Sequence, residues 1–147
     1  MCYAPFAGEA PGAYVETRPV IDAPVKAATA FFKVLRDMPV DREVCLMLVL
    51  DTKHALITTE VVSLGSVDHT FMAPREVYRS ALTHGAAAIV LCHTHPSGST
   101  EPSSDDEAVT RRLAKAGETL GVNLLDHLVI GGQIWTSMAR RGSLGNN

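Results

Sequence analysis

The sequence is poor in cysteine, and its 147 residues include only Cys2, Cys45 and Cys92. An odd number, with the last two inside apolar runs, argues against a disulfide framework and favours buried free thiols. Long hydrophobic runs are also missing, since the longest, Val44 to Leu50 and Ala86 to Cys92, are much too short to cross a bilayer. The N-terminus lacks the basic-then-apolar order of a signal peptide. These absences predict a cytoplasmic protein that does not enter a membrane.

The chain has no excess of positive charge either. Its formal net charge is -3 and its isoelectric point is about 6.0, so no overall basic field would hold it on nucleic-acid phosphates. A role on DNA therefore requires a local basic patch. At the two short basic groups we favour a solvated helix face over phosphate contact. These groups are Arg111, Arg112 and Lys115, and Arg140 with Arg141.

The composition is that of an ordinary globular protein, with 46% hydrophobic and 20% charged residues. A length of 147 residues suits one domain with one core. Residues 1–24 hold four prolines and two glycines, a density that breaks helices and predicts an extended arm. We therefore expect an arm over residues 1–24, a single domain over 25–142 and a tail over 143–147.

The spacing of hydrophobic residues predicts the elements of that domain. The apolar run 86–92 is typical of a central strand covered on both faces, and it leads directly into His93. The expected elements are, in order, a helix from Val25 to about Met38, strands Val44–Leu50 and Ala55–Leu64, a helix from Pro74 to near Gly85, a strand Ala86–Cys92, a helix after Pro102 ending at Gly121, and short strands near Leu128–Ile130 and Ile134–Ser137. This order predicts an α/β fold in which a mixed sheet is flanked by helices.

Two histidines leave the end of the predicted central strand. In His93-Thr94-His95, strand alternation places both imidazoles on one side, so that both rings can reach one cation. Asp106 lies in the first turn of the next predicted helix, where its carboxylate can point back at the same position. Three protein ligands are typical of a catalytic zinc site, which keeps its fourth position for water, whereas a fourth side chain closes a structural site. We therefore predict Zn²⁺ bound by His93, His95 and Asp106.

A metal-activated water also needs a base, and the oxyanion formed by its attack needs a hydrogen-bond donor. Glu60 is the predicted base, because it interrupts an otherwise apolar and hydroxyl-bearing strand. Ser103, three residues before Asp106, is the predicted donor to the oxyanion.

Each of these residues also has a plainer interpretation. The two histidines suit polar strand ends, Glu60 suits a solvent-facing strand position, and Ser103 with Asp106 suits a helix capping box. His127 either orients a metal ligand or only fixes the entry to a strand, and we favour the second role. Cys92 should point away from the site into the core. Three neighbouring acids could compete with Asp106 as ligands: Glu101, Asp105 and Glu107.

The combined pattern resembles that of the JAMM (MPN+, or JAB domain) zinc metalloproteases. The matching positions are Glu60, His93-x-His95, then seven residues, Ser103, two residues and Asp106. More narrowly, the chain resembles the bacterial RadC branch of that family from roughly Val44 to Gly142. This narrower resemblance rests on His93-Thr94-His95-Pro96-Ser97-Gly98, Pro102-Ser103, Pro74-Arg75-Glu76 and Asp126-His127.

The resemblance implies a JAB/MPN fold, a mixed sheet flanked by helices with cytidine-deaminase-like layering. It also implies zinc at the positions matching His93, His95 and Asp106, with the Glu60 position as the base. Characterised JAMM relatives hydrolyse peptide or isopeptide bonds, often at the C-terminus of ubiquitin-like modifiers. The implied activity is thus that of a zinc metallopeptidase acting on a protein or peptide.

One feature of the RadC branch does not match. RadC proteins usually carry an N-terminal helix-hairpin-helix region associated with DNA, and the residues before Val44 are too few for it, which suggests a short form. A DNA-repair-associated accessory or nucleic-acid-binding protein is the alternative function, and hydrolysis at phosphorus by the same metal is a third. The oligomeric state is left open by the sequence.

Overall fold

The computed structural model describes residues 17–64 and 72–144. Its elements follow the predicted order of helix, hairpin, helix, strand, helix and hairpin, which confirms the α/β class. They are α1 (Pro24–Leu35), β1 (Val44–Leu50), β2 (Leu56–Leu64), α2 (Pro74–Thr83), β3 (Ala88–Thr94), α3 (Ser104–Leu120), β4 (Asn123–Gly131) and β5 (Ile134–Ser137).

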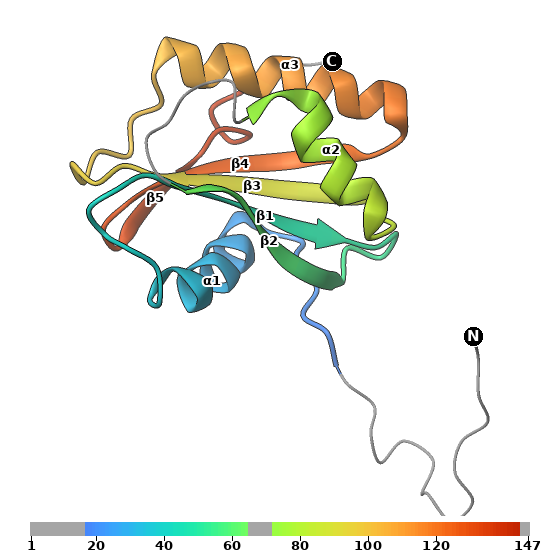
Figure 1. Cartoon of the computed structure of the whole chain (residues 1–147), viewed down its shortest axis with the longest axis horizontal. Helices are drawn as coiled ribbons and strands as arrows, with labels where there is room; N and C mark the ends of the chain where they lie inside the picture. Colours follow the sequence, from blue (N-terminus) through green and yellow to red (C-terminus); the bar gives the residue numbers. More distant parts are fainter. Residues whose placement is uncertain (1–16, 65–71, 145–147) are drawn as a thin grey trace, which may run out of the picture.

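The strands form one mixed sheet in the order β2-β1-β3-β4-β5 (Figure 1). β3 is central, antiparallel to β1 and parallel to β4, while both outer pairs are antiparallel. Because parallel neighbours cannot be joined by a tight turn, the chain crosses from β3 to β4 through α3. The N-terminus of α3 therefore lies at the same edge of the sheet as the end of β3.

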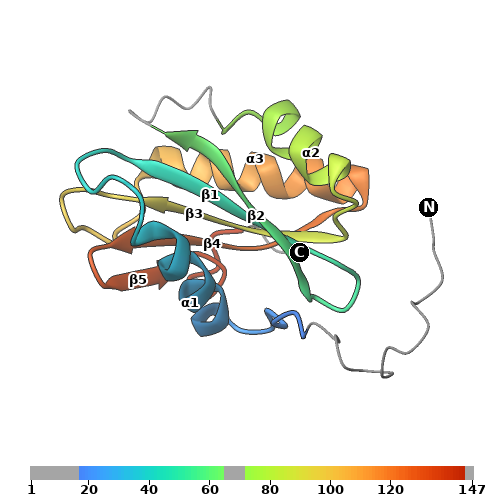
Figure 2. The same ribbon diagram turned by 60° about the horizontal axis from the view of Figure 1, so that its bottom comes forward.

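Helices cover both faces of the sheet, α1 on one and α2 with α3 on the other (Figures 1 and 2). Strand alternation divides the core accordingly: Leu46 and Cys92 pack on the α1 side, and Met47 and Leu91 pack on the α2–α3 side. This double covering explains why all seven residues of β1 are buried. The predicted inward position of Cys92 is confirmed.

Several element boundaries differ from the predicted ones: β2 begins at Leu56 rather than Ala55, and β3 begins at Ala88 rather than Ala86. α1 ends at Leu35, and the chain continues to Met38 only as a turn. β3 extends to Thr94, so that His93 lies within the strand rather than after it. β4 begins at Asn123, where it pairs with Ala88, because a parallel partner on β3 stabilises a segment whose own sequence has no clear period.

Only the last residues of the predicted N-terminal arm are described. They are extended: Val20 bridges Ala55, and the Ile21 amide donates to the His54 carbonyl over 2.8 Å. The predicted arm ends one residue early, because Pro24 is already in α1. Residues 1–16, which include Cys2, and residues 145–147 lie outside the described residues.

Two of the three cysteines lie in the described part of the chain. Cys45 and Cys92 are free thiols and both are buried, and burial raises the pKa of Cys45 to about 12. Over residues 17–64 and 72–144, no helix combines the length and apolar character needed to cross a membrane.

The Asp126 carboxylate on β4 anchors the end of β5 and the residues after it through hydrogen bonds. Its buried carboxylate accepts hydrogen bonds from the His127 amide at 2.7 Å, the Ser137 hydroxyl at 2.6 Å and the Ala139 amide at 3.0 Å. Three donors on one carboxylate hold the end of β5 against β4. The bond from the His127 amide, with the one that the Met138 amide donates to the His127 carbonyl over 3.0 Å, also fixes the backbone on either side of His127.

We expect Asp126→Asn to lower the free energy of unfolding by about 1–3 kcal/mol, because an amide NH₂ would face a donor in a buried place. Denaturant unfolding of the protein with a chelator present measures this loss. Asp37→Asn, at an exposed position, is the matched control. Equal stability of the two variants would contradict the role given to Asp126.

Candidate metal centre

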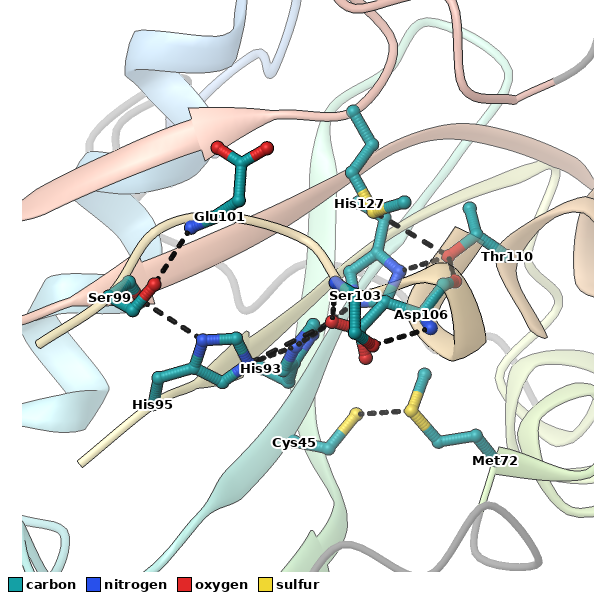
Figure 3. Close-up of polar contacts among 11 residues, drawn as sticks. Cys45, Met72, His93, His95, Ser99, Glu101, Ser103, Asp106, Thr110 and His127 are labelled. Atoms are coloured by element: carbon teal, nitrogen blue, oxygen red, sulfur yellow. Dashed lines mark hydrogen bonds and ion pairs between the residues drawn. The ribbon is translucent and has the colours of Figure 1, made fainter. Parts of the chain in front are cut away.

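Three predicted ligands meet where β3 ends and α3 begins (Figure 3). His93 is the penultimate residue of β3, His95 follows the strand, and Asp106 lies in the first turn of α3. Their ligand atoms all lie within 4.8 Å of one another, which is the geometry required of a shared cation site. The predicted grouping of His93, His95 and Asp106 is therefore present in the structure.

The spacing of the three ligand atoms fits a small tetrahedral metal ion. His93 Nε2 lies 3.0 Å from His95 Nε2 and 3.4 Å from Asp106 Oδ2, and His95 Nε2 lies 3.8 Å from the same oxygen. A tetrahedron with zinc–ligand bonds of about 2.1 Å has edges of about 3.4 Å. The donor set therefore suits zinc in both chemistry and size.

His95 is held from behind by the loop that follows it. Its Nδ1 lies 3.0 Å from the Ser99 carbonyl, and because a carbonyl only accepts, Nδ1 must carry the proton. Nε2, the other nitrogen of the ring, is thereby turned towards His93 and Asp106. The His95 amide also donates to the Ile130 carbonyl over 2.8 Å, which anchors the start of this loop on β4.

Asp106 is positioned by the helix cap. The Ser103 hydroxyl accepts from the Asp106 amide at 3.0 Å, and Asp106 Oδ2 accepts from the Ser103 amide at 2.8 Å, so the predicted capping box is confirmed. Burial by itself raises the pKa of Asp106, but His93 and the Ser103 hydrogen bonds outweigh that effect and hold the pKa well below its usual range. The Asp106 carboxylate can therefore cap α3 and face the predicted metal position at the same time.

His93 is held by a side chain for which the sequence left the role open. His93 Nδ1 lies 2.8 Å from His127 Nε2, and His127 Nδ1 lies 2.7 Å from the Thr110 hydroxyl. Burial, followed by the proximity of His93, lowers the pKa of His127 well below its ordinary value, so the ring is neutral. His127 therefore contacts the predicted ligand His93 directly, a contact that supports the orienting role over the structural role favoured from the sequence.

Glu60 does not join this group. Its carboxylate lies 3.5 Å from the Ser80 hydroxyl and 3.9 Å from His84 Nε2, both at the α2 side of the sheet. In the strand register Glu60 stands opposite Met47, which stands opposite Leu91, two residues before His93. Glu60 thus occupies the same face of the sheet as His93, but it lies two strands away and two residues further along the sheet.

The neighbouring acids do not displace Asp106. Glu101 forms a two-bond pair with Arg141 at 3.0 and 3.2 Å, and Glu107 accepts from the Ser143 hydroxyl at 2.9 Å. Among the described residues, the only such cluster consists of the two histidines and Asp106. Asp105, the third acid considered from the sequence, is not part of it.

The basic groups show two different environments. Arg111, Arg112 and Lys115 lie exposed on the outer side of α3, in agreement with the solvated helix face favoured from the sequence. Arg141 binds Glu101, and the Arg140 guanidinium lies over the Trp135 ring at 5.7 Å. The second group thus makes intramolecular contacts.

Two hollows border His95. One, of about 350 Å³, lies between α1 and the β4–β5 hairpin and is bordered mainly by apolar residues, including Phe32, Leu35, Pro39 and Ile130. The other, of about 590 Å³, is bordered by a charged segment, Asp41 to Glu43. The side chain of His95 is 18% exposed and that of Asp106 11%, against 2% for His93, so the cluster is reached by solvent from the side of His95 and Asp106.

The loop behind His95 passes very close to Gly131. A Cβ atom on Gly131 would lie 2.2 Å from the Gly98 carbonyl oxygen and 2.8 Å from the Ser99 carbonyl oxygen. The Ser99 oxygen is the acceptor that orients His95. Only a residue without a side chain at position 131 therefore lets the Ser99 carbonyl stay where it orients His95, a predicted metal ligand.

The protein-family model described as RadC-like JAB domain matches residues 9–143. A UPF0758 protein of Alcanivorax borkumensis is 46% identical over 124 residues, which cover 84% of this chain and 54% of the relative. A UPF0758 protein of Desulforamulus reducens is 39% identical over 127 residues, or 86% of this chain and 55% of the relative. A UPF0758 protein of Pseudomonas fluorescens is 49% identical over 109 residues, which cover 74% of this chain and 48% of the relative. The chain spans about half the length of these curated relatives.

We expect the wild-type protein to bind about one zinc ion per chain, since three donors leave room for a single ion. His95→Ala should lose this metal, and His54→Asn, outside the cluster, should keep it. Elemental analysis after dialysis against zinc measures both. An equal zinc content in the wild-type protein and in His95→Ala would disprove the predicted site.

Gly131→Ala should weaken zinc binding, because the new methyl group pushes the Ser99 carbonyl away from His95. Gly117→Ala is the matched control, since its methyl group collides with Val122 and Tyr78 instead. Both variants should unfold more easily, by about 1–3 kcal/mol, through overpacking. Competition of each variant with a zinc indicator should show a lower zinc affinity for Gly131→Ala but not for Gly117→Ala. An equal loss of zinc affinity in both variants would contradict the specific role of Gly131.

Proposed function

The chain belongs to the RadC-like JAB domain family, and on that premise we propose that it is a zinc-dependent metallopeptidase that hydrolyses a peptide or isopeptide bond. The observation that carries the proposal is the convergence of two imidazole nitrogens and one carboxylate oxygen at a shielded but accessible point. Two nitrogens and one oxygen are a common ligand set for catalytic zinc. The resemblance to the JAMM metalloproteases supplies the reaction class.

The geometry supports catalysis more than scaffolding. A structural zinc would need a fourth protein ligand, and no further metal-ligating side chain joins the three within the described residues. A zinc ion bound there would polarise a carbonyl and activate a water molecule. The partial exposure of His95 leaves one side of the site open to a substrate.

The hollows beside His95 are suited to a polypeptide. The apolar one receives a side chain from one side of the scissile bond, and the charged segment Asp41 to Glu43 contacts polar backbone or side chains on the other. A protein or peptide substrate, including the tail of a ubiquitin-like modifier, is therefore proposed. We also propose a cytoplasmic location, which suits the buried free thiols.

Two side chains are assigned to the chemical step. The oxygen of the Ser103 hydroxyl accepts in the cap, which leaves its proton available for the oxyanion of the attacked carbonyl. Glu60 is proposed to carry the proton of the water to the leaving amine, and its position on the same sheet face as His93 supports this role.

We expect Glu60→Gln to keep its zinc while losing at least about 100-fold in cleavage rate, because the amide cannot take up a proton. The substrate is a peptide library from a digested bacterial proteome, and mass spectrometry detects the new termini. Glu118→Gln, on the exposed side of α3, controls for loss of one negative charge. Full activity of Glu60→Gln would disprove the base; a zinc-loaded wild type that cleaves nothing would count against the peptidase.

A further inference from the structure

The apolar hollow beside His95 lies on the α1 face of the sheet, between α1 and the β4–β5 hairpin (Figure 2). Phe32 and Leu35 of α1 border this hollow on one side, and Ile130 of β4 borders it on the other. His95 and Pro96 border both this hollow and the charged hollow beside residues 41–43. A polypeptide that passes over His95 can therefore reach both hollows at once.

The rim of the apolar hollow exposes hydrophobic side chains. Val40, which borders the hollow, is 85% exposed, and Pro39 before it is also exposed. Phe32 and Leu35 pack against the core but remain only partly buried. This exposed apolar surface contributes little to the free energy of folding, and an apolar side chain placed in the hollow would remove it from water.

The same rim carries one positive charge. Among the residues that border the hollow, Arg36 is the only arginine, lysine or acid, and it is exposed at the end of α1. Within the described residues, no ion pair joins Arg36 to an acid. A guanidinium is always charged, and its planar set of N–H donors matches a carboxylate. The charge on the rim therefore complements an acidic ligand.

The charged hollow has the opposite balance. It is bordered by two acids, Asp41 and Glu43, and by one cation, Arg42, whose Nε already lies 3.4 Å from Asp41 Oδ1. A carboxylate of a bound polypeptide is thus repelled on that side of His95 and attracted on the side of Arg36. The two hollows together give a bound chain a preferred direction.

We propose that the apolar hollow is the specificity site of this protein, and that it selects a polypeptide segment in which a large apolar residue stands next to an acidic residue. The apolar side chain packs between Phe32, Leu35 and Ile130, and the neighbouring carboxylate pairs with the Arg36 guanidinium. This inference rests on the proposed metallopeptidase function, which makes the bound segment part of a substrate.

The test measures binding separately from cleavage. Three fluorescein-labelled octapeptides consist of glycine and serine except for a central pair, which is leucine–aspartate, leucine–lysine or serine–aspartate. Fluorescence anisotropy with the zinc-supplied protein gives their affinities, and mass spectrometry confirms that each peptide is intact during the reading. We expect leucine–aspartate to bind about fivefold more tightly than leucine–lysine and about tenfold more tightly than serine–aspartate. Equal affinities for the three peptides, or no binding of any, would overturn the proposal.

Charge reversal on α1 identifies the side chain that reads the acid. Arg36→Glu should bind leucine–lysine more tightly than leucine–aspartate, because the rim charge is now negative. Lys33→Glu is the matched control: Lys33 is exposed on the same helix but borders a different hollow, so the wild-type preference should persist. An unchanged preference in Arg36→Glu would overturn the proposal.

Cleavage of the same three peptides is then followed by mass spectrometry over a longer incubation. A wild type that binds with the expected preference but cleaves none of them would support the binding site and count against the metallopeptidase. Cleavage of all three at equal rates would support the metallopeptidase and overturn the proposed specificity. The two proposals therefore fail in distinguishable ways.

Discussion

The candidate metal centre depends on holding two imidazole nitrogens and a carboxylate oxygen close to one another. These atoms lie 3.0 to 3.8 Å apart, a separation at which lone pairs repel unless a proton or a metal ion lies among them. Each is therefore held from its far side: His95 by the Ser99 carbonyl, Asp106 by the Ser103 amide and His93 by His127. Most of the local structure around the site serves to place these three anchors.

The parallel pairing of β3 with β4 is what makes this arrangement possible. It requires a crossover, and the crossover helix α3 starts at the edge where β3 delivers its histidines. The same pairing brings His127 beside the central strand, and the end of β4 supports the loop that orients His95. A helix N-terminus also favours a carboxylate in its first turn, which suits Asp106.

Membership of the RadC-like JAB domain family supports the proposed reaction class, while the contacts of this chain suggest the roles of its residues. Glu60 lies on the same sheet face as His93 but contacts Ser80 and His84 of the α2 segment. Its proposed role is therefore to transfer a proton, and not to orient the predicted metal ligands. His127 and Thr110 lie buried behind His93. The predicted ligands are thus held from the protein interior, while the side chains of His95 and Asp106 stay partly exposed.

The sequence by itself determined the order of helices and strands and the set of three ligands, because both depend on local patterns: hydrophobic period, strand alternation and the position of Asp106 in a helix start. Only the tertiary structure decided the contacts of His127, Thr110 and Gly131 and the surroundings of Glu60. A histidine inside an apolar strand has no local signal for its partner. That partner is set by the register between β3 and β4 and by the packing of α3, which place residues 93, 110 and 127 in contact.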